Sequence, residues 1–90
     1  MAAKRTFHEI RELLLLSLAI GKKAINQLAS AAGVNWRTTE NHLTYLLGRG
    51  MVVEVFTSDY VRIFELSEKG KEYIAQMHPH IQFEEKKTNG

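Results

Sequence analysis

The segment INQLASAAGVNWRTTENHLTYLLGRGMV, residues 25–52, constrains the fold most, because it reads as two short helices joined by a tight turn. The first helix is predicted over 25–32, where small apolar residues recur, and Gly33 ends it. Asn35 can cap a second helix over 36–49 by accepting a backbone N–H with its side-chain oxygen. A β-branched run follows immediately after Gly50. This order predicts a two-helix unit that leads straight into a strand.

The flanking segments predict the rest of a small α+β fold. Thr6 and Glu9 form a capping box for a helix that ends at Gly21. Residues 22–24 suit a very short edge strand, and residues 52–57 and 60–66 suit two strands around a Ser58-Asp59 turn. A short last helix begins after Ser67, contains Gly70, which is expected to weaken it slightly, and stops before Pro79. We therefore expect a three-helix core, a two- or three-stranded β-hairpin sheet and a short C-terminal helix.

Composition limits the chain to one small domain. Its 90 residues are 44% apolar and contain no cysteine, which excludes disulfides and thiolate metal sites. We expect one domain over residues 1–78 and a polar, mobile tail over 79–90, in which Ile81 and Phe83 could dock on a partner. The apolar run 13–20 is too short to cross a bilayer, and no signal-peptide pattern follows it. A soluble, cytoplasmic protein is the simplest expectation.

The net charge of +2 permits nucleic-acid binding without arguing for it, but its distribution is uneven. Residues 1–23 carry five basic and two acidic side chains, a balance of +3. Residues 51–66 carry Arg62 against Glu54, Asp59 and Glu65, a balance of −2. The positive potential therefore lies at the start of the domain, and the predicted hairpin is mildly acidic.

A helix-turn-helix unit points to double-stranded DNA, because the second helix fits the major groove and its first residues reach base edges. Arg37 is the best candidate for a guanine or phosphate contact, and Asn41, one turn later, can pair with adenine. Thr38 and Thr44 suit phosphates or a thymine methyl group, and the helix N-terminus at Asn35 favours a phosphate. Basic side chains elsewhere are candidates for phosphate contacts: Lys4, Arg5, Lys22, Lys23 and Arg62.

Each of these DNA-contact assignments has a purely structural alternative. Arg37, Glu40, Asn41 and Thr44 could form an ordinary solvated helix face. If this face meets DNA, Glu40 disfavours phosphates and must bind a cytosine amine, or it pairs instead with Arg37. Trp36 could pack over the turn or lie against the DNA backbone, and Tyr45 could pack on the surface or bind a phosphate. His42 is expected to be a partly buried structural residue, with a sensor as the alternative.

No catalytic or metal-binding arrangement can be assembled from the sequence. His78 and His80 lie close together but lack a third ligand on a rigid element, so a surface tail is preferred to a metal site. There is no nucleophile triad, glycine-rich phosphate loop or pair of carboxylates in a cleft. We expect no enzyme activity, no cofactor and no metal.

Residues 7–77 resemble a winged helix-turn-helix DNA-binding family, with a recognition helix like that of MarR and ArsR regulators. Regulators of this kind read S-x-x-T-V-x-x-H-L-x-x-L-x-x-x-G-L-V in that helix, and six positions coincide here: Thr38, His42, Leu43, Leu46, Gly50 and Val52. The stretch FELSEKGKEYI, residues 64–74, is similar to their Y-x-L-T-x-K-G-x-x-x-L signature. Chains of this size without cysteine most resemble archaeal or archaeal-virus regulators and small chromatin-associated proteins.

The resemblance implies a homodimer that reads two half-sites, with each hairpin, or wing, touching the flanking minor groove or backbone. The tip 57–60 lacks the usual lysine or arginine and has only Arg62 nearby, which argues against deep minor-groove insertion. The last helix is too short for a coiled-coil arm, so the dimer is expected to form through the first helix, the last helix and the tail. The first helix is apolar nearly all round in its second half, which suits either a crowded core or a dimer contact.

The sequence thus predicts a nucleoid-associated, sequence-specific transcriptional regulator that places helix 36–49 in the major groove. Two alternatives stay open. One is a non-specific chromatin-type DNA-binding protein, and the other is a winged helix that binds proteins and not DNA.

Overall fold

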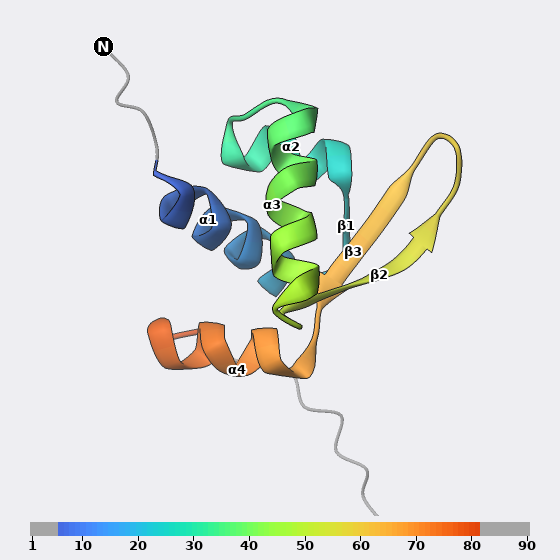
Figure 1. Ribbon diagram of the computed structural model, residues 1–90. Helices are drawn as coiled ribbons and strands as arrows, with labels where there is room; N and C mark the ends of the chain where they lie inside the picture. The colour runs from blue at the N-terminus through green and yellow to red at the C-terminus, as the bar shows by residue number, and fades with distance from the viewer. Residues whose placement is uncertain (1–5, 82–90) are drawn as a thin grey trace, which may run out of the picture.

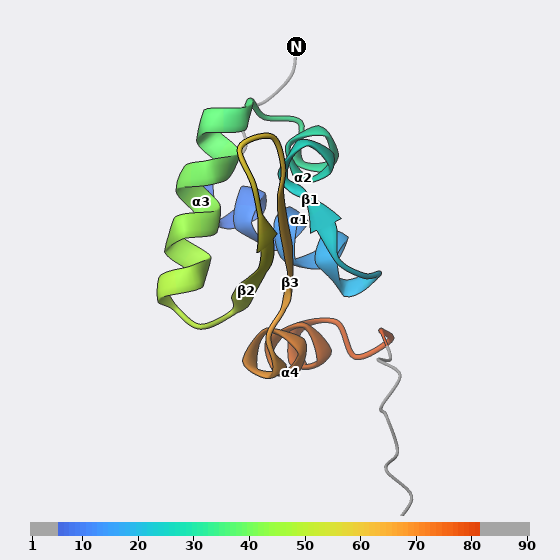
Figure 2. The ribbon, with the colours of Figure 1, turned by 90° about the vertical axis from the view of Figure 1, so that its right-hand side faces the viewer.

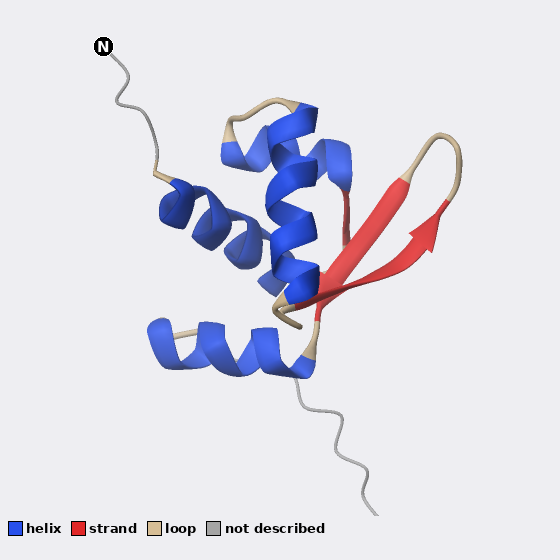
Figure 3. Cartoon of the chain, viewed as in Figure 1, coloured by secondary structure: helices blue, strands red, loops and turns tan. Residues whose placement is uncertain are grey.

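Residues 6–81 form four helices and three strands in the computed structural model, which describes that part of the chain. Their order is α1 (Phe7–Ala19), β1 (Lys23–Ala24), α2 (Ile25–Ala32), α3 (Trp36–Gly48), β2 (Val52–Thr57), β3 (Arg62–Leu66) and α4 (Glu68–Met77). β2 and β3 project from the helices as a hairpin (Figure 1, Figure 3). The predicted α+β class and element order are confirmed, and the predictions on Lys4, Arg5 and Phe83 lie outside the described residues.

Side-chain caps fix the starts of three helices. Thr6 and Glu9 form the expected box, with the Glu9 N–H donating to Thr6 Oγ1 at 3.1 Å and the Thr6 N–H donating to Glu9 Oε1 at 2.8 Å. Asn35 Oδ1 accepts the Thr38 N–H at 2.7 Å at the start of α3. The hydroxyl oxygen of Ser67 accepts the Gly70 N–H at 3.0 Å at the start of α4. Each cap satisfies a backbone donor that has no partner within its helix.

The turn between α2 and α3 is closed by Gly33, which takes a left-handed conformation with φ of 70°. A residue with a Cβ is strained there, so glycine is the favoured choice. Val34 then packs partly buried against the core, and its N–H donates to the Ala29 carbonyl at 3.1 Å. The predicted tight turn is therefore confirmed, and it sets α3 across α2.

The sheet has the strand order β1-β3-β2, and both pairings are antiparallel. The pairs Val52–Leu66 and Glu54–Phe64 put Val52, Phe64 and Leu66 on the face that packs against the helices, where all three are buried. The pairs Val53–Glu65 and Phe56–Ile63 belong to the opposite face. We call these four residues the outer sheet face.

The second strand begins two residues later than predicted. The hydroxyl oxygen of Ser58 accepts the N–H groups of Tyr60 at 3.2 Å and Val61 at 3.1 Å, and the Ser58 N–H donates to the Val61 carbonyl at 2.8 Å. These local bonds close the turn around Tyr60 and Val61, so β3 starts only at Arg62.

Helix α1 lies at the centre of the molecule and contacts α2, α3, α4 and β3. Its buried residues are Ile10, Leu14, Leu15 and Leu18, while Leu13, Leu16 and Ala19 are partly buried against the same core. The crowded-core interpretation is thus confirmed, and a dimer contact through the exposed remainder stays a prediction. Ile81, expected to be available to a partner, also packs partly buried against this core.

Gly70 does more than weaken α4. A Cβ at this position would overlap the backbone carbonyl oxygen of Met51 and lie 3.1 Å from Leu66 Cδ2. The same Met51 carbonyl accepts the Ser67 N–H at 3.0 Å, which brings the start of α4 against the segment after α3. Glycine is therefore required here by close approach of two backbones.

Candidate nucleic-acid interface

Helix α3 presents one polar face to solvent. Its buried residues are Thr39, His42, Leu43 and Leu46, which face the core. At the spacing of an α-helix the opposite side carries Arg37, Asn41, Thr44 and Gly48, and all four are exposed. We call these four residues the outward face of α3. Figure 2 shows α3 at the edge of the molecule, with neither the sheet nor another helix on its outer side.

The side chains that could read bases are free to do so. Among residues 6–81, neither the Arg37 side chain nor the Asn41 side chain has a hydrogen-bond or ion-pair partner. Thr44 donates its hydroxyl to the Glu40 carbonyl at 2.9 Å, so toward a ligand it can only accept. Asn35 uses its oxygen as the helix cap, which leaves only its amide NH₂ for another contact.

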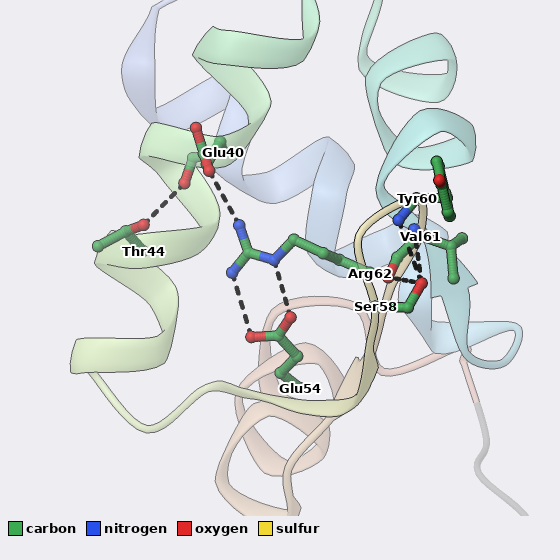
Figure 4. A network of polar contacts seen from close by, with 7 residues as sticks. All are labelled: Glu40, Thr44, Glu54, Ser58, Tyr60, Val61 and Arg62. Atoms are coloured by element: carbon green, nitrogen blue, oxygen red, sulfur yellow. Dashed lines mark hydrogen bonds and ion pairs between the residues drawn. The ribbon is translucent and has the colours of Figure 1, made fainter.

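Glu40 and Arg62 belong to an ion-pair network that joins α3 to the hairpin (Figure 4). Arg62 Nη1 donates to Glu40 Oε2 at 3.0 Å, and Arg62 also donates to both Glu54 oxygens, from Nε at 2.8 Å and from Nη2 at 3.1 Å. The alternative in which Glu40 pairs with Arg37 is not found, because the Glu40 carboxylate is paired with the Arg62 guanidinium. The network holds the hairpin in place relative to α3. The charge of Arg62 also neutralises part of the negative charge of Glu40 and Glu54.

The two hydrogen bonds between Arg62 and Glu54 shift the pKa of each residue in the direction that favours its charged form. The hydrogen bond from Arg62 holds the pKa of Glu54 below its ordinary value, against the opposing effect of burial. The hydrogen bond to Glu54 raises the pKa of Arg62. Arg62 is therefore a permanently charged group already held by two carboxylates, which limits what it can offer a phosphate.

Arg11 of α1, which the sequence does not single out as a functional candidate, lies directly against α3. Its guanidinium carbon is 3.6 Å from the centroid of the Tyr45 ring, and its Nε donates to His42 Nδ1 at 3.1 Å. Sequence spacing could not reveal these contacts, because His42 and Tyr45 lie on a different helix, 31 and 34 residues away from Arg11. Tyr45 is 42% exposed, so its ring is packed by Arg11 while part of it still faces solvent.

His42 is a buried structural histidine, as expected, with only 5% of its surface exposed. Its ring packs against Phe7 in a T-shaped arrangement, with 5.1 Å between the ring centroids. Burial lowers the pKa of His42, and the positive charge of Arg11 lowers it further. The neutral ring is the form that can accept the Arg11 hydrogen bond.

Lowering the pH is therefore expected to destabilise the protein through His42. The unfolded chain binds a proton at this histidine more readily than the folded chain, so the free energy of unfolding falls as pH drops from 7 through about 6.5 and below, until the folded histidine also titrates. Urea denaturation of the native protein and His42→Gln at pH 7.5 and 5.5 measures this. The variant should lose less stability between the two pH values, and equal losses would contradict the assignment.

The other predicted site residues are dispersed. Trp36 is 44% exposed at the first position of α3. Lys22 and Lys23 lie before and in β1, which the hairpin separates from α3 in Figure 2. The structure thus brings Asn35, Trp36, Arg37, Thr38, Asn41, Thr44 and Tyr45 together on α3 but leaves the two lysines apart from them.

His8 and His78 both contact the carboxylate of Glu12, and the ring of His78 also contacts that of His80. His78 Nε2 lies 2.9 Å from Glu12 Oε2, His8 Nε2 lies 3.4 Å from Glu12 Oε1, and the rings of His78 and His80 are 5.9 Å apart. Within residues 6–81 no group of three or more side chains is arranged to hold a metal ion. None of the described helices is long and apolar enough to cross a membrane.

Solved structures share this architecture. A MarR family transcriptional regulator from Silicibacter pomeroyi is 27% identical, with a TM-score of 0.71 over 78% of this chain and 48% of its own length. Adhesin competence repressor from Streptococcus pyogenes is 24% identical, with a TM-score of 0.65 over 80% of this chain and 54% of its own. The chain therefore spans about half the length of these two regulators.

A shorter solved structure is matched over more of its own length. Mb0332 from Mycobacterium bovis, a possible ArsR-family regulator solved as a homodimeric winged helix-turn-helix DNA-binding domain, is 20% identical, with a TM-score of 0.61 over 84% of this chain and 76% of that domain. No protein-family model matches the sequence, and no curated protein matches it. The order of helices and strands in this chain is thus found together with an overall fold that these structures share. The chain is a winged helix-turn-helix protein with the fold of MarR- and ArsR-type transcriptional regulators.

Proposed function

We propose that this chain is a transcriptional regulator that binds double-stranded DNA sequence-specifically as a homodimer and has no enzymatic activity. The observation that carries the proposal is the outward face of α3, where Arg37 and Asn41 are exposed and have no partner among the described residues. The MarR and ArsR-type neighbours support it, because they are transcriptional regulators of the same fold. Such a protein acts inside the cell, on the nucleoid. The archaeal or viral origin implied by the resemblance stays a prediction.

Helix α3 enters the major groove, whose width of about 12 Å admits an α-helix with its side chains. Arg37 donates two hydrogen bonds to a guanine, and Asn41, one turn later, pairs with an adenine. The first N–H groups of α3, those of Trp36 and Arg37, lie against a phosphate, and the Trp36 side chain packs on the adjacent backbone. Each good base contact contributes about 1–3 kcal/mol of discrimination.

The dimer forms through α1, α4 and the tail. Most of α1 and α4 lies on the side of the molecule away from the tip of the hairpin (Figure 1). Apolar side chains remain partly exposed there, and Met77 at the end of α4 is 50% exposed. A contact on this side leaves the outward face of α3 open in both copies. The two recognition helices then read two half-sites.

Arg37→Ala is expected to weaken binding to the preferred duplex about tenfold or more and to relax its selectivity at one base pair. The preferred sequence is first selected from a random duplex pool with the native protein. Fluorescence anisotropy then compares that duplex with a shuffled one at two salt concentrations. Arg49→Ala removes the same charge from an exposed arginine at the C-terminal end of α3, outside the outward face, and serves as the matched control.

The same titrations separate the alternatives. Equal affinity for selected and shuffled duplexes, lost together on adding salt, would identify a non-specific chromatin-type protein. No duplex binding at either salt concentration would leave a winged helix that binds proteins. Unchanged selectivity in Arg37→Ala would remove Arg37 from the site.

A further inference from the structure

Arg11 of α1 is held in place beside the outward face of α3. Its guanidinium carbon lies 3.6 Å from the centroid of the Tyr45 ring and 5.6 Å from that of the Phe7 ring. Its Nε donates to His42 Nδ1 at 3.1 Å. Two aromatic rings and one hydrogen bond therefore orient this guanidinium. A side chain that is already oriented loses little conformational freedom when it binds a ligand.

The outer edge of this guanidinium is not used by the protein. Within residues 6–81 no carboxylate forms an ion pair with Arg11, and neither of its terminal nitrogens donates a hydrogen bond. Phe7 and Tyr45 are 67% and 42% exposed, and Arg11 is only partly buried, so solvent reaches the cluster. An arginine stacked on aromatic rings with its forked N–H groups free is suited to bind two oxygens of one phosphate.

The surrounding charges leave this arginine available. A hollow of about 180 Å³ lies between α1, α3 and α4, and the charged side chains that line it include Arg11, Arg49 and the carboxylate of Glu12. Glu12 contacts His78 Nε2 at 2.9 Å and His8 Nε2 at 3.4 Å, and it forms no ion pair with either arginine. The carboxylate nearest to Arg11 along α1 is thus directed to other partners.

The two flanks of α3 differ in what they offer to DNA. At helical spacing Tyr45 lies on one side of the outward face and Glu40 on the other, and Figure 1 shows α1 and the hairpin on these two sides of α3. On the hairpin side, Arg62 is already held by Glu40 and Glu54. A helix in the major groove has a phosphate backbone on each flank. On the α1 side the oriented guanidinium of Arg11 still has unused donors.

We propose that Arg11 binds a backbone phosphate at the edge of the major groove that α3 occupies, with the Tyr45 ring as its platform. This inference rests on the proposed function and adds to it a contact from α1, outside the two-helix unit. Phosphate contacts position a protein on the duplex without reading the sequence. Arg11 therefore sets where α3 lies in the groove, and with it the base pairs that Arg37 and Asn41 meet.

Arg11→Ala should weaken binding to the selected and the shuffled duplex by a similar factor, about tenfold, because the contact is to the backbone. The slope of log Kd against log salt concentration should decrease by about 0.9, the value for one lost phosphate contact.

Arg49→Ala is the matched control for Arg11→Ala. Arg49 lines the same hollow, but its guanidinium carbon is 5.9 Å from the Tyr45 centroid, and its side chain forms no hydrogen bond within residues 6–81. It is therefore not oriented toward a phosphate, and its removal should cost less than about twofold in affinity. Equal losses in the two variants would show that only net charge matters and would overturn the proposal.

Duplexes that carry one neutral methylphosphonate at a time identify the phosphate itself. At one position in each half-site the substitution should weaken binding of the native protein about tenfold, and it should cost Arg11→Ala almost nothing, because the charge pair is already lost. A free phosphate ion has the same chemistry, but only a contact to the DNA backbone gives this coupling. Methylphosphonate losses that are the same in both proteins at every position would show that Arg11 touches no backbone phosphate.

Two further variants separate the platform from the charge. Tyr45→Phe keeps the ring and should keep most of the affinity, whereas Tyr45→Leu should lose most of what Arg11→Ala loses, and native affinity in Tyr45→Leu would contradict the platform role. Arg11→Lys keeps the charge without the fork and should lose about threefold. If circular dichroism shows that Arg11→Ala is unfolded, Arg11→Lys takes its place in the methylphosphonate comparison.

The native protein separates a failure of this inference from a failure of the proposed function. A native protein that binds no duplex contradicts both. Sequence-specific binding without coupling between Arg11 and any phosphate contradicts this inference alone.

Discussion

Gly70→Ala is expected to lower the free energy of unfolding by about 3 kcal/mol, a large part of the margin of a chain this size. The added Cβ would overlap the backbone carbonyl oxygen of Met51, which cannot move freely because it accepts the Ser67 N–H at 3.0 Å. The strain therefore falls on the junction of α3, β2 and α4. A clash with backbone is costlier than one with the end of a flexible side chain.

Thermal denaturation followed by circular dichroism measures this effect, with an expected decrease in Tm of more than about 10 °C. Gly48→Ala is the matched control, because a Cβ there meets nothing within 4 Å and Gly48 is helical. The control should be neutral or more stable, by at most about 1 kcal/mol, because alanine favours a helix. A Gly70→Ala protein as stable as the control would show that the two backbones can separate cheaply.

Arg62→Ala is expected to weaken DNA binding about tenfold and to lower the free energy of unfolding by about 1 kcal/mol. Its removal leaves the carboxylates of Glu40 and Glu54 without their partner, one of them on the recognition helix. The loss of stability is modest because the three side chains keep between 23% and 33% of their surface exposed. The larger effect is on DNA, which meets an uncompensated negative charge beside the outward face of α3.

A second substitution separates this indirect role from direct contact. Glu40→Gln in the Arg62→Ala background should restore much of the lost affinity, because it removes the charge that Arg62 neutralised. Arg62→Lys keeps a positive charge but cannot bond both carboxylates in the same two-point geometry, so it should fall between the native protein and Arg62→Ala. An affinity that Glu40→Gln leaves unrestored would mean that Arg62 contacts the phosphates itself.

The parts of the fold that depend on neighbours in sequence are predictable. The three caps use residues three positions apart, the Gly33 turn lies between two apolar periodicities, and helix 25–32 and strand 52–57 have the predicted bounds. The outward face of α3 follows from the same periodicity, because the buried positions of a helix define the exposed ones. Arg37 and Asn41 can therefore be selected from the sequence alone.

The contacts that join distant segments are not predictable from spacing. Glu40 has a local partner in reach at Arg37, but the pairing of β2 with β3 brings Arg62 to it from 22 residues away. Arg11 and Tyr45 meet only because α1 crosses α3. By sequence Gly70 is only a weak helix former, because the Met51 carbonyl beside it belongs to another part of the chain. Local rules place α3, while the tertiary fold decides which of its charged side chains are free.

The fluorescence of Trp36 during titration with the selected duplex tests the central claim most directly. Trp36 is the only tryptophan, stands at the first position of α3 and is 44% exposed, so its emission reports on this surface alone. Binding through the outward face of α3 should shift or quench the emission in step with the anisotropy of the DNA, and Arg37→Ala should move both curves to higher concentration together. A duplex that binds with full affinity while the Trp36 emission stays constant would show that DNA is held elsewhere on the protein.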